Sequence, residues 1–297
     1  MIKGLSITPP VLGRISIGRV VERNGKRLPE KDDQFTITSQ VQTKEGWVPH
    51  PLDEALRKSS PNLKLRSIPV TLLFNDPDLN LRAEYSLFDR SNGRPMCVGN
   101  GETCRRVTTT GIQTLPCPGT DGCEIARGGA CKPYGRLNVK LGDDDELGTF
   151  IFRTTGYNSI RTLAARLHYF KAISGDLLAC MPLELRLRGK STAQSRGTPI
   201  YYVDLTIRDG MTLDEALSQA QQTHARRETY AYNQQALDVV ARAGFGNGAF
   251  EDGPDEAVDV IEEFFPDRFG ESGAPTVKPS LTAKLAKMTS LAEEAPT

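Results

Sequence analysis

The stretch from residue 148 to residue 175, GTFIFRTTGYNSIRTLAARLHYFKAISG, combines a strand pattern with a helix pattern. Its first part is rich in β-branched and aromatic residues, which is typical of a strand. The apolar residues of its second part recur at i, i+3, i+4 and i+7 and define one helical face: Ile160, Leu163, Ala164 and Leu167. Asn158 or Ser159 is expected to cap the first turn, and Gly175 to end the helix.

Strand patterns lie on both sides of this stretch. The segments PLELRLRG (182–189) and YYVDLTIRDG (201–210) alternate apolar and polar residues, and similar runs lie within residues 12–41 and 67–88. Helices are expected around residues 230–242 and after Thr212, where Thr212 and Glu215 match a capping box. The order of these elements predicts an α+β fold with an antiparallel or mixed sheet and a few packed helices.

The composition divides the chain into a body and an acidic tail. The 297 residues are 38% hydrophobic, enough for one domain over residues 1–250. Residues 251–271 contain nine acidic residues and one basic residue, and we interpret residues 251–297 as an acidic linker and a disordered, flexible tail. Without residues 251–271, the chain keeps 36 basic and 28 acidic residues. This excess suits contact with nucleic-acid phosphates, although it equally suits solubility, and the acidic segment can compete for the same surface.

Within the acidic run, apolar residues recur at helical spacing, among them Val258, Ile261 and Phe264. We predict a partner-binding helix at residues 255–265, with the last helix of the fold as the alternative. The polar loop between the two late strands, GKSTAQSRGT, carries Lys190 and Arg196. Together with Arg161 they are candidate contacts to nucleic acid or to a protein partner, and a solvated hairpin loop is the alternative.

Five of the six cysteines fall between positions 97 and 131, and Cys180 stands apart in an apolar segment, as expected of a core residue. No apolar run is long enough to span a bilayer, and the N-terminal residues lack the apolar region of a signal peptide, so we expect a cytoplasmic protein. In a reducing compartment, clustered cysteines indicate a metal site more often than disulfides. The glycines around them permit tight turns, so a zinc-binding loop is predicted at about residues 95–135.

Five cysteines compete for the four positions of a tetrahedral zinc site. Cys104 directly precedes Arg105 and is expected to begin a strand, so it is set aside, although it remains the alternative to Cys97. The predicted ligands are Cys97, Cys117, Cys123 and Cys131. A structural Zn²⁺ is preferred to a catalytic one because the three histidines are scattered along the chain, and ordinary reduced cysteines are the alternative to any metal. Phosphate-binding, zinc-protease and serine-hydrolase motifs are absent from the sequence.

The order of several motifs resembles the recombination directionality factor-like family, whose members occur in phages and other mobile genetic elements. The resemblance covers roughly residues 10–210. It includes VLGRISIGRVVERNGKRLPEKDDQFTIT, CVGNG, CPGTDGCEIARGGACKPYGRLNVKL, GTFIFRTTGYNSIRTLAARL and MPLELRLRG. By position the four predicted zinc ligands match cysteines of the family, Cys104 is an addition, and the segment from Thr155 to Ser159 matches a turn before a helix. The long acidic tail departs from the family pattern.

The resemblance implies a DNA-recombination accessory protein. Characterised members of the family bind a large serine integrase on DNA and switch it from integration to excision without cutting strands themselves. We therefore expect a non-enzymatic protein whose partners are such an integrase, or another recombination protein, and DNA. A direct nucleic-acid-binding component of a recombination, repair or defence complex is the alternative, and a metal-dependent hydrolase is the third hypothesis.

Overall fold

A computed structural model of the chain describes most of the predicted body. The described residues are 8–23, 26–43, 46–142, 147–191, 199–244 and Phe264, with the backbone alone for residues 19–32. The predicted acidic tail, residues 251–297, and the predicted partner-binding segment 255–265 lie outside the described residues, apart from Phe264. Arg196 also lies outside them.

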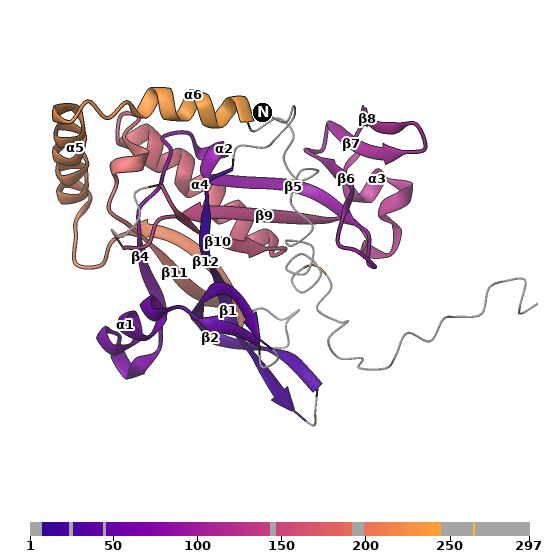
Figure 1. Cartoon of the computed structure of the whole chain (residues 1–297), viewed down its shortest axis with the longest axis horizontal. Coiled ribbons are helices and arrows are strands. Elements are labelled where there is room, and N and C mark those ends of the chain that lie inside the picture. Colours follow the sequence, from indigo (N-terminus) through magenta and orange to yellow (C-terminus); the bar gives the residue numbers. More distant parts are fainter. Residues whose placement is uncertain are drawn as a thin grey trace, which may run out of the picture.

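Two sheets form the framework of the described residues (Figure 1). The larger sheet has the strand order β3-β2-β1-β10-β9-β5-β6-β7-β8, and the smaller sheet has the order β12-β11-β4. Only the β1–β10 pair of these strands is parallel, so the larger sheet is mixed. The strands are β1 (Val11–Arg23), β2 (Lys26–Thr43), β3 (Gly46–Pro49), β4 (Ser67–Val70), β5 (Leu81–Phe88), β6 (Pro95–Gly99), β7 (Thr103–Thr108), β8 (Gly111–Pro116), β9 (Lys132–Val139), β10 (Thr149–Thr154), β11 (Leu183–Lys190) and β12 (Ile200–Ile207).

The helices pack around these sheets, with α5 at one end of the molecule and the β6–β8 strands at the other (Figure 1). They are α1 (Pro51–Ser59), α2 (Pro77–Asn80), α3 (Gly119–Gly122), α4 (Tyr157–Ile173), α5 (Leu213–Thr229) and α6 (Gln234–Gly244), with the 3-10 turns η1 (Pro61–Leu63), η2 (Glu124–Gly129) and η3 (Leu178–Cys180). This arrangement confirms the predicted mixed α+β architecture. In the described part of the chain, no helix is long and apolar enough to cross a membrane.

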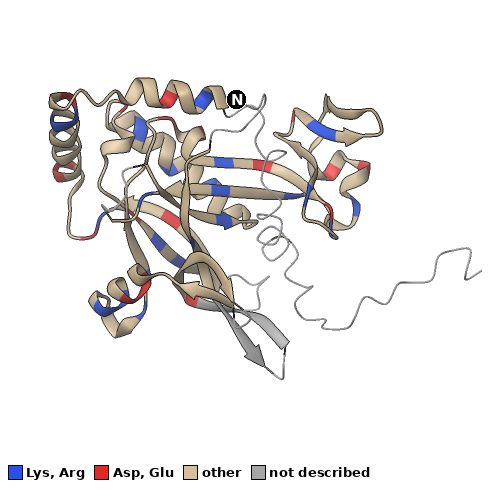
Figure 2. Ribbon diagram, in the orientation of Figure 1, with Lys and Arg blue, Asp and Glu red and all other residues tan. Residues whose placement is uncertain are grey.

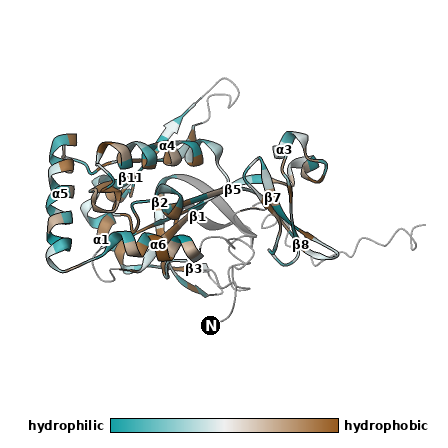
Figure 3. Ribbon diagram, turned by 90° about the horizontal axis from the view of Figure 1, so that it is seen from above, coloured by the Kyte–Doolittle hydropathy of each residue, from teal (hydrophilic) through white to brown (hydrophobic). Residues whose placement is uncertain are grey.

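Helix α4 supplies the central stripe of the hydrophobic core. Leu163 and Leu167 are fully buried and belong to one cluster with Leu137 of β9 and Phe152 of β10. The helix approaches β9 closely because Gly135 lacks a side chain: a Cβ there would stand 2.8 Å from the Ile160 side chain. Helix α4 therefore contacts β5 and β9 of the larger sheet, and it packs more extensively against β12 of the smaller sheet. Figure 3 shows the helix alongside the strands.

The start of α4 differs from the predicted capping. The N-cap is Gly156, with no side-chain capping bond, so neither Asn158 nor Ser159 caps the helix. Both side chains are used elsewhere: Asn158 Oδ1 accepts from Lys190 Nζ at 2.9 Å, and Ser159 Oγ accepts from the backbone N–H of Val203 at 3.1 Å. These contacts join α4 to the β11–β12 pair, and local capping rules do not consider such tertiary partners.

Other helix-end predictions are confirmed. Gly175 follows the end of α4 with φ +64°, a conformation that suits glycine. Thr212 and Glu215 form the predicted capping box at the start of α5. The later helix begins at Gln234, four residues after the predicted start at position 230. Its predicted N-terminal part instead contains Ala231 with φ +55°, which ends helical geometry there.

Candidate metal centre

The five clustered cysteines come from separate elements that meet at the β6–β8 end of the larger sheet. Cys97 lies on β6, Cys104 lies on β7, and Cys117 directly follows β8. Cys123 lies between α3 and η2, and Cys131 directly precedes β9. The β6–β7 hairpin pairs Gly99 with Cys104 and Cys97 with Arg106, which brings the side chains of the two strands together.

The sulfur atoms of this cysteine cluster lie close to one another and to Arg106. Interaction with the Cys97 side chain raises the pKa of the Arg106 guanidinium above its ordinary value. The Arg106 guanidinium also lies 4.0 Å from Cys104 Sγ and 3.8 Å from Cys123 Sγ. Cys117 packs over the backbone of β6, since a Cβ on Gly99 would stand 3.0 Å from its Sγ. All four predicted ligands and Cys104 therefore belong to one neighbourhood.

Burial and mutual proximity disfavour negative charge on these thiols. Burial, followed by the neighbouring cysteines Cys97, Cys117 and Cys123, raises the pKa of Cys131 to about 11. Burial, followed by interaction with the Cys97 side chain, likewise raises the pKa of Cys104 to about 11. Thiolates gathered this closely require a compensating cation. A coordinating metal ion deprotonates its thiol ligands and supplies that charge.

The donor set fits a soft or borderline metal such as zinc, but the sulfurs are not arranged as a closed coordination sphere. Over the described ranges, no three cysteine, histidine or carboxylate side chains are grouped as metal ligands. The choice of Cys97, Cys117, Cys123 and Cys131 over Cys104 stays a prediction, because Cys104 is buried in the same cluster. The three histidines lie elsewhere: His50 caps α1, and His168 and His224 lie on α4 and α5.

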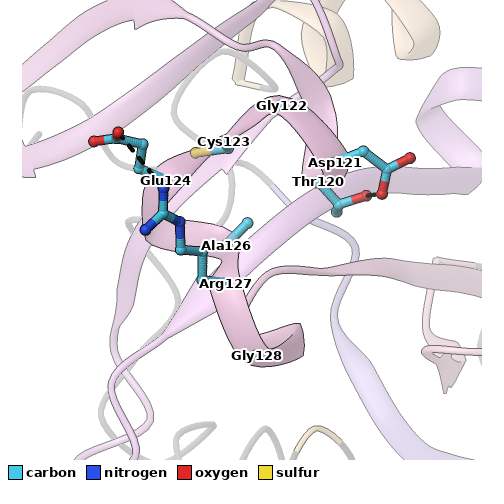
Figure 4. Close-up of a pocket in the computed structure, with 8 residues that line it drawn as sticks. All are labelled: Thr120, Asp121, Gly122, Cys123, Glu124, Ala126, Arg127 and Gly128. Atoms are coloured by element: carbon cyan, nitrogen blue, oxygen red, sulfur yellow. Dashed lines mark hydrogen bonds and ion pairs between the residues drawn. The ribbon is translucent and has the colours of Figure 1, made fainter.

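A hollow of about 280 Å³ lies beside Cys123 (Figure 4). It is lined by α3 and η2, and Cys123 is one of its lining residues. Glu124 and Arg127 form an ion pair at 3.8 Å across it, and both side chains are more than four-fifths exposed. Exposed pairs of this kind contribute little stability.

Sequence reasoning missed Arg106 as a member of this site. The signal was present, because Cys104 and Arg106 are two residues apart on a strand and therefore share one face. Cys180 lies apart from the cluster, as predicted. It is buried in the main core, where Arg227 Nη1 lies 3.5 Å from its Sγ.

The predicted basic contacts are only partly brought together. Lys190, at the end of β11, reaches the first turn of α4 through its bond to Asn158. Arg161 lies one turn further along α4 and is exposed. These two cations therefore lie near the same helix end, whereas Arg196 lies outside the described residues.

Comparison with known families identifies one match. A family model described as recombination directionality factor-like matches residues 12–208, about two thirds of the chain. The matched range begins at β1 and ends directly after β12, and it contains the whole cysteine cluster. Comparison with curated proteins and with solved structures finds no match.

Proposed function

This chain belongs to the recombination directionality factor-like family, and we propose that it is a non-enzymatic accessory protein that binds a large serine integrase on DNA and biases it toward excision. The observation that carries the proposal is the extent of the family match, which covers both sheets, α4 and the cysteine cluster. A recombination accessory role, with partners in the recombination machinery, is what the family itself indicates.

A switch of this kind needs surface rather than catalytic groups. An accessory protein shifts the equilibrium between two conformations of its target only if it binds one of them more tightly. To change the ratio of two such states from 1:99 to 99:1, the difference in affinity must be about 10⁴-fold. A rigid body with a fixed surface suits this task, because little conformational entropy is lost on binding.

The metal is proposed as the device that makes one end of this body rigid. Zn²⁺ would be held by Cys97, Cys117, Cys123 and Cys131, and its chemistry there would be structural. These ligands belong to β6, the segment after β8, the α3–η2 turn and the start of β9. Their shared ion would add a link between segments that strand pairing and bonds such as that from the Cys117 N–H to the Glu102 carbonyl, at 2.8 Å, already connect in part.

The function is tested by excision in a reconstituted reaction. The tagged protein is purified from its host with nuclease present, the co-purifying recombinase is identified by mass spectrometry, and that recombinase is then purified alone. Adding this protein to the recombinase and an excision substrate is expected to increase excised product and to decrease integration. An unchanged product ratio at saturating protein refutes the proposal, as does strand cleavage by this protein without the recombinase.

The metal is tested by the zinc content and the melting temperature of purified variants. Cys117→Ser and Cys123→Ser are expected to lose bound zinc and to melt at a lower temperature. Cys104→Ser is the matched control inside the cluster, and it is expected to keep about one zinc per chain. A wild-type protein that contains no zinc, and whose melting is unchanged by both ligand substitutions, refutes the metal site but leaves the recombination role open.

A further inference from the structure

Helix α4 carries basic side chains but no acidic ones. Its 17 residues, YNSIRTLAARLHYFKAI, include Arg161, Arg166 and Lys171 and neither aspartate nor glutamate. Leu163 and Leu167 mark the side of the helix that faces the core. Arg161 is exposed, and the Arg166 side chain is 42% exposed, so both lie outside that buried side. The solvent side of α4 is therefore positively charged, with no carboxylate of its own.

Strand β11 brings two further cations to the same region. Leu185 of β11 is fully buried in the core, so Arg188 and Lys190, at odd spacing from it, lie on the opposite face of the smaller sheet. Lys190 Nζ donates to Asn158 Oδ1 in the first turn of α4, at 2.9 Å. Arg161 lies three residues after Asn158, one turn further along the helix. The end of β11 and the start of α4 therefore share one surface.

A buried carboxylate holds the two central arginines in place. Asp204 of β12 is 2% exposed, and it accepts from Arg166 Nε at 3.0 Å and from Arg188 Nε at 2.6 Å. The two arginine side chains nevertheless remain 42% and 41% exposed. That Nε bond is the only side-chain hydrogen bond that Arg188 makes with the described residues. Its two terminal amines are thus left to meet a ligand.

These four residues form what we call the α4–β11 basic surface: Arg161, Arg166, Arg188 and Lys190. Figure 2 shows basic positions, in blue, on α4 and on the strands of the smaller sheet. Within the described part of the chain, the one carboxylate that these cations contact is the buried Asp204. The next cation along β11, Arg186, is instead paired with Glu184 and the exposed Asp209, so the surface ends there. Several separated cations of this kind suit an extended polyanion better than one small anion.

We propose that the α4–β11 basic surface binds the phosphate backbone of DNA. Guanidinium and ammonium groups are the usual partners of phosphate oxygens, and the Asp204 carboxylate orients two of them before the ligand arrives. Such preorganisation reduces the conformational entropy that is lost on binding. Phosphate contacts fix the position of a protein on a duplex without reading its sequence. The choice of DNA as the polyanion rests on the proposed recombination function.

The expected signature is a dependence of DNA affinity on salt. Each neutralised phosphate contributes about 0.9 to the slope of log K against log salt, so four contacts give a slope of about −3.6. Affinity then falls on the order of 100-fold between about 50 and 200 mM salt. With two of the four cations removed, the slope halves and the same change in salt lowers the affinity about tenfold.

The test is fluorescence anisotropy of the full-length protein with a labelled DNA duplex of arbitrary sequence, across that range of salt. The surface variant combines Arg161→Gln with Lys190→Gln, and it leaves Asp204 and both of its arginines intact. The control combines Arg94→Gln, between β5 and β6, with Arg226→Gln on α5; it removes the same charge from two other exposed positions. We expect the salt slope to halve in the surface variant and to stay unchanged in the control.

A second control, Asn158→Ala, removes the bond to Lys190 but keeps its charge, and it is expected to bind DNA as the wild type does. Equal slopes for the wild type and the surface variant overturn the inference, and so does an equal loss in the charge-matched control. A wild-type protein that does not bind the duplex at about 50 mM salt also overturns it.

A protein partner is the competing occupant of this surface. If the surface variant binds DNA as the wild type does but no longer co-purifies the recombinase, the surface belongs to that partner and the inference is overturned. The anisotropy assay contains no integrase, so DNA binding can fail while the excision assay succeeds, and the excision assay can fail while DNA binding is retained.

Discussion

Ser159→Ala tests how the first turn of α4 is fixed to the smaller sheet. Ser159 is 3% exposed, and its Oγ accepts the backbone N–H of Val203 at 3.1 Å. Val203 is on β12, the outer strand of the smaller sheet, so this N–H points out of that sheet toward α4. With alanine at position 159, the donor stays buried and loses its acceptor.

An unsatisfied buried donor costs about 1–3 kcal/mol of stability. The higher helix propensity of alanine returns about 0.5 kcal/mol of this. We therefore expect Ser159→Ala to lower the free energy of unfolding by about 1–2 kcal/mol, measured by urea denaturation at 25 °C with circular dichroism.

Asn158→Ala is the matched control, because it removes the neighbouring bond to Lys190, which is solvent-exposed. Its expected change is within about 0.5 kcal/mol. The reasoning is refuted if Ser159→Ala changes stability no more than Asn158→Ala, since the bond to Val203 would then contribute nothing beyond a surface contact.

Two further substitutions follow from the same structure. Burial raises the pKa of Asp204, but hydrogen bonds from Arg166 and Arg188 outweigh burial and hold this pKa below its ordinary value. A carboxylate whose pKa is lower in the folded state stabilises the protein fully at pH values above its unfolded-state pKa of about 3.9. This stabilisation is lost as the pH falls through the lower, folded-state pKa. Asp204→Asn should therefore lower stability by roughly 2 kcal/mol at pH 7, and the difference from wild type should narrow below about pH 4; a difference of equal size at both pH values contradicts this. Gly99→Ala places a Cβ 2.6 Å from the Cys104 Cβ and 2.8 Å from the Thr103 carbonyl oxygen. Overpacking of this kind costs about 1–3 kcal/mol, and we expect a lower melting temperature together with reduced zinc binding; an unchanged melting curve would show that β6 and β7 separate freely.

Local sequence patterns determined most helices and strands of the body. They also determined the start of α5, through its capping box, and the end of α4, through Gly175. The alternation in residues 183–190 and 200–207 is a property of a strand with one buried face, and the structure contains both strands. The five clustered cysteines were also recognised as one group, because they fall between positions 97 and 131 and the glycines among them permit tight turns. Family membership likewise follows from motif order, without any knowledge of contacts.

Only the tertiary structure decided which distant residues meet. Capping rules predicted that the Ser159 side chain caps its own helix. In the structure its Oγ instead accepts a hydrogen bond from the backbone N–H of Val203, 44 positions away. The register of three strands brings Arg82, Arg136 and Arg153 side by side, and a shift of one residue would turn each side chain to the opposite face. Phe264 likewise contacts the rings of Phe88 on β5 and Tyr134 on β9, which are distant from it in the sequence. Local propensity acts over a few residues, but strand register and packing are set by the whole core, and these decide which charges and rings become neighbours.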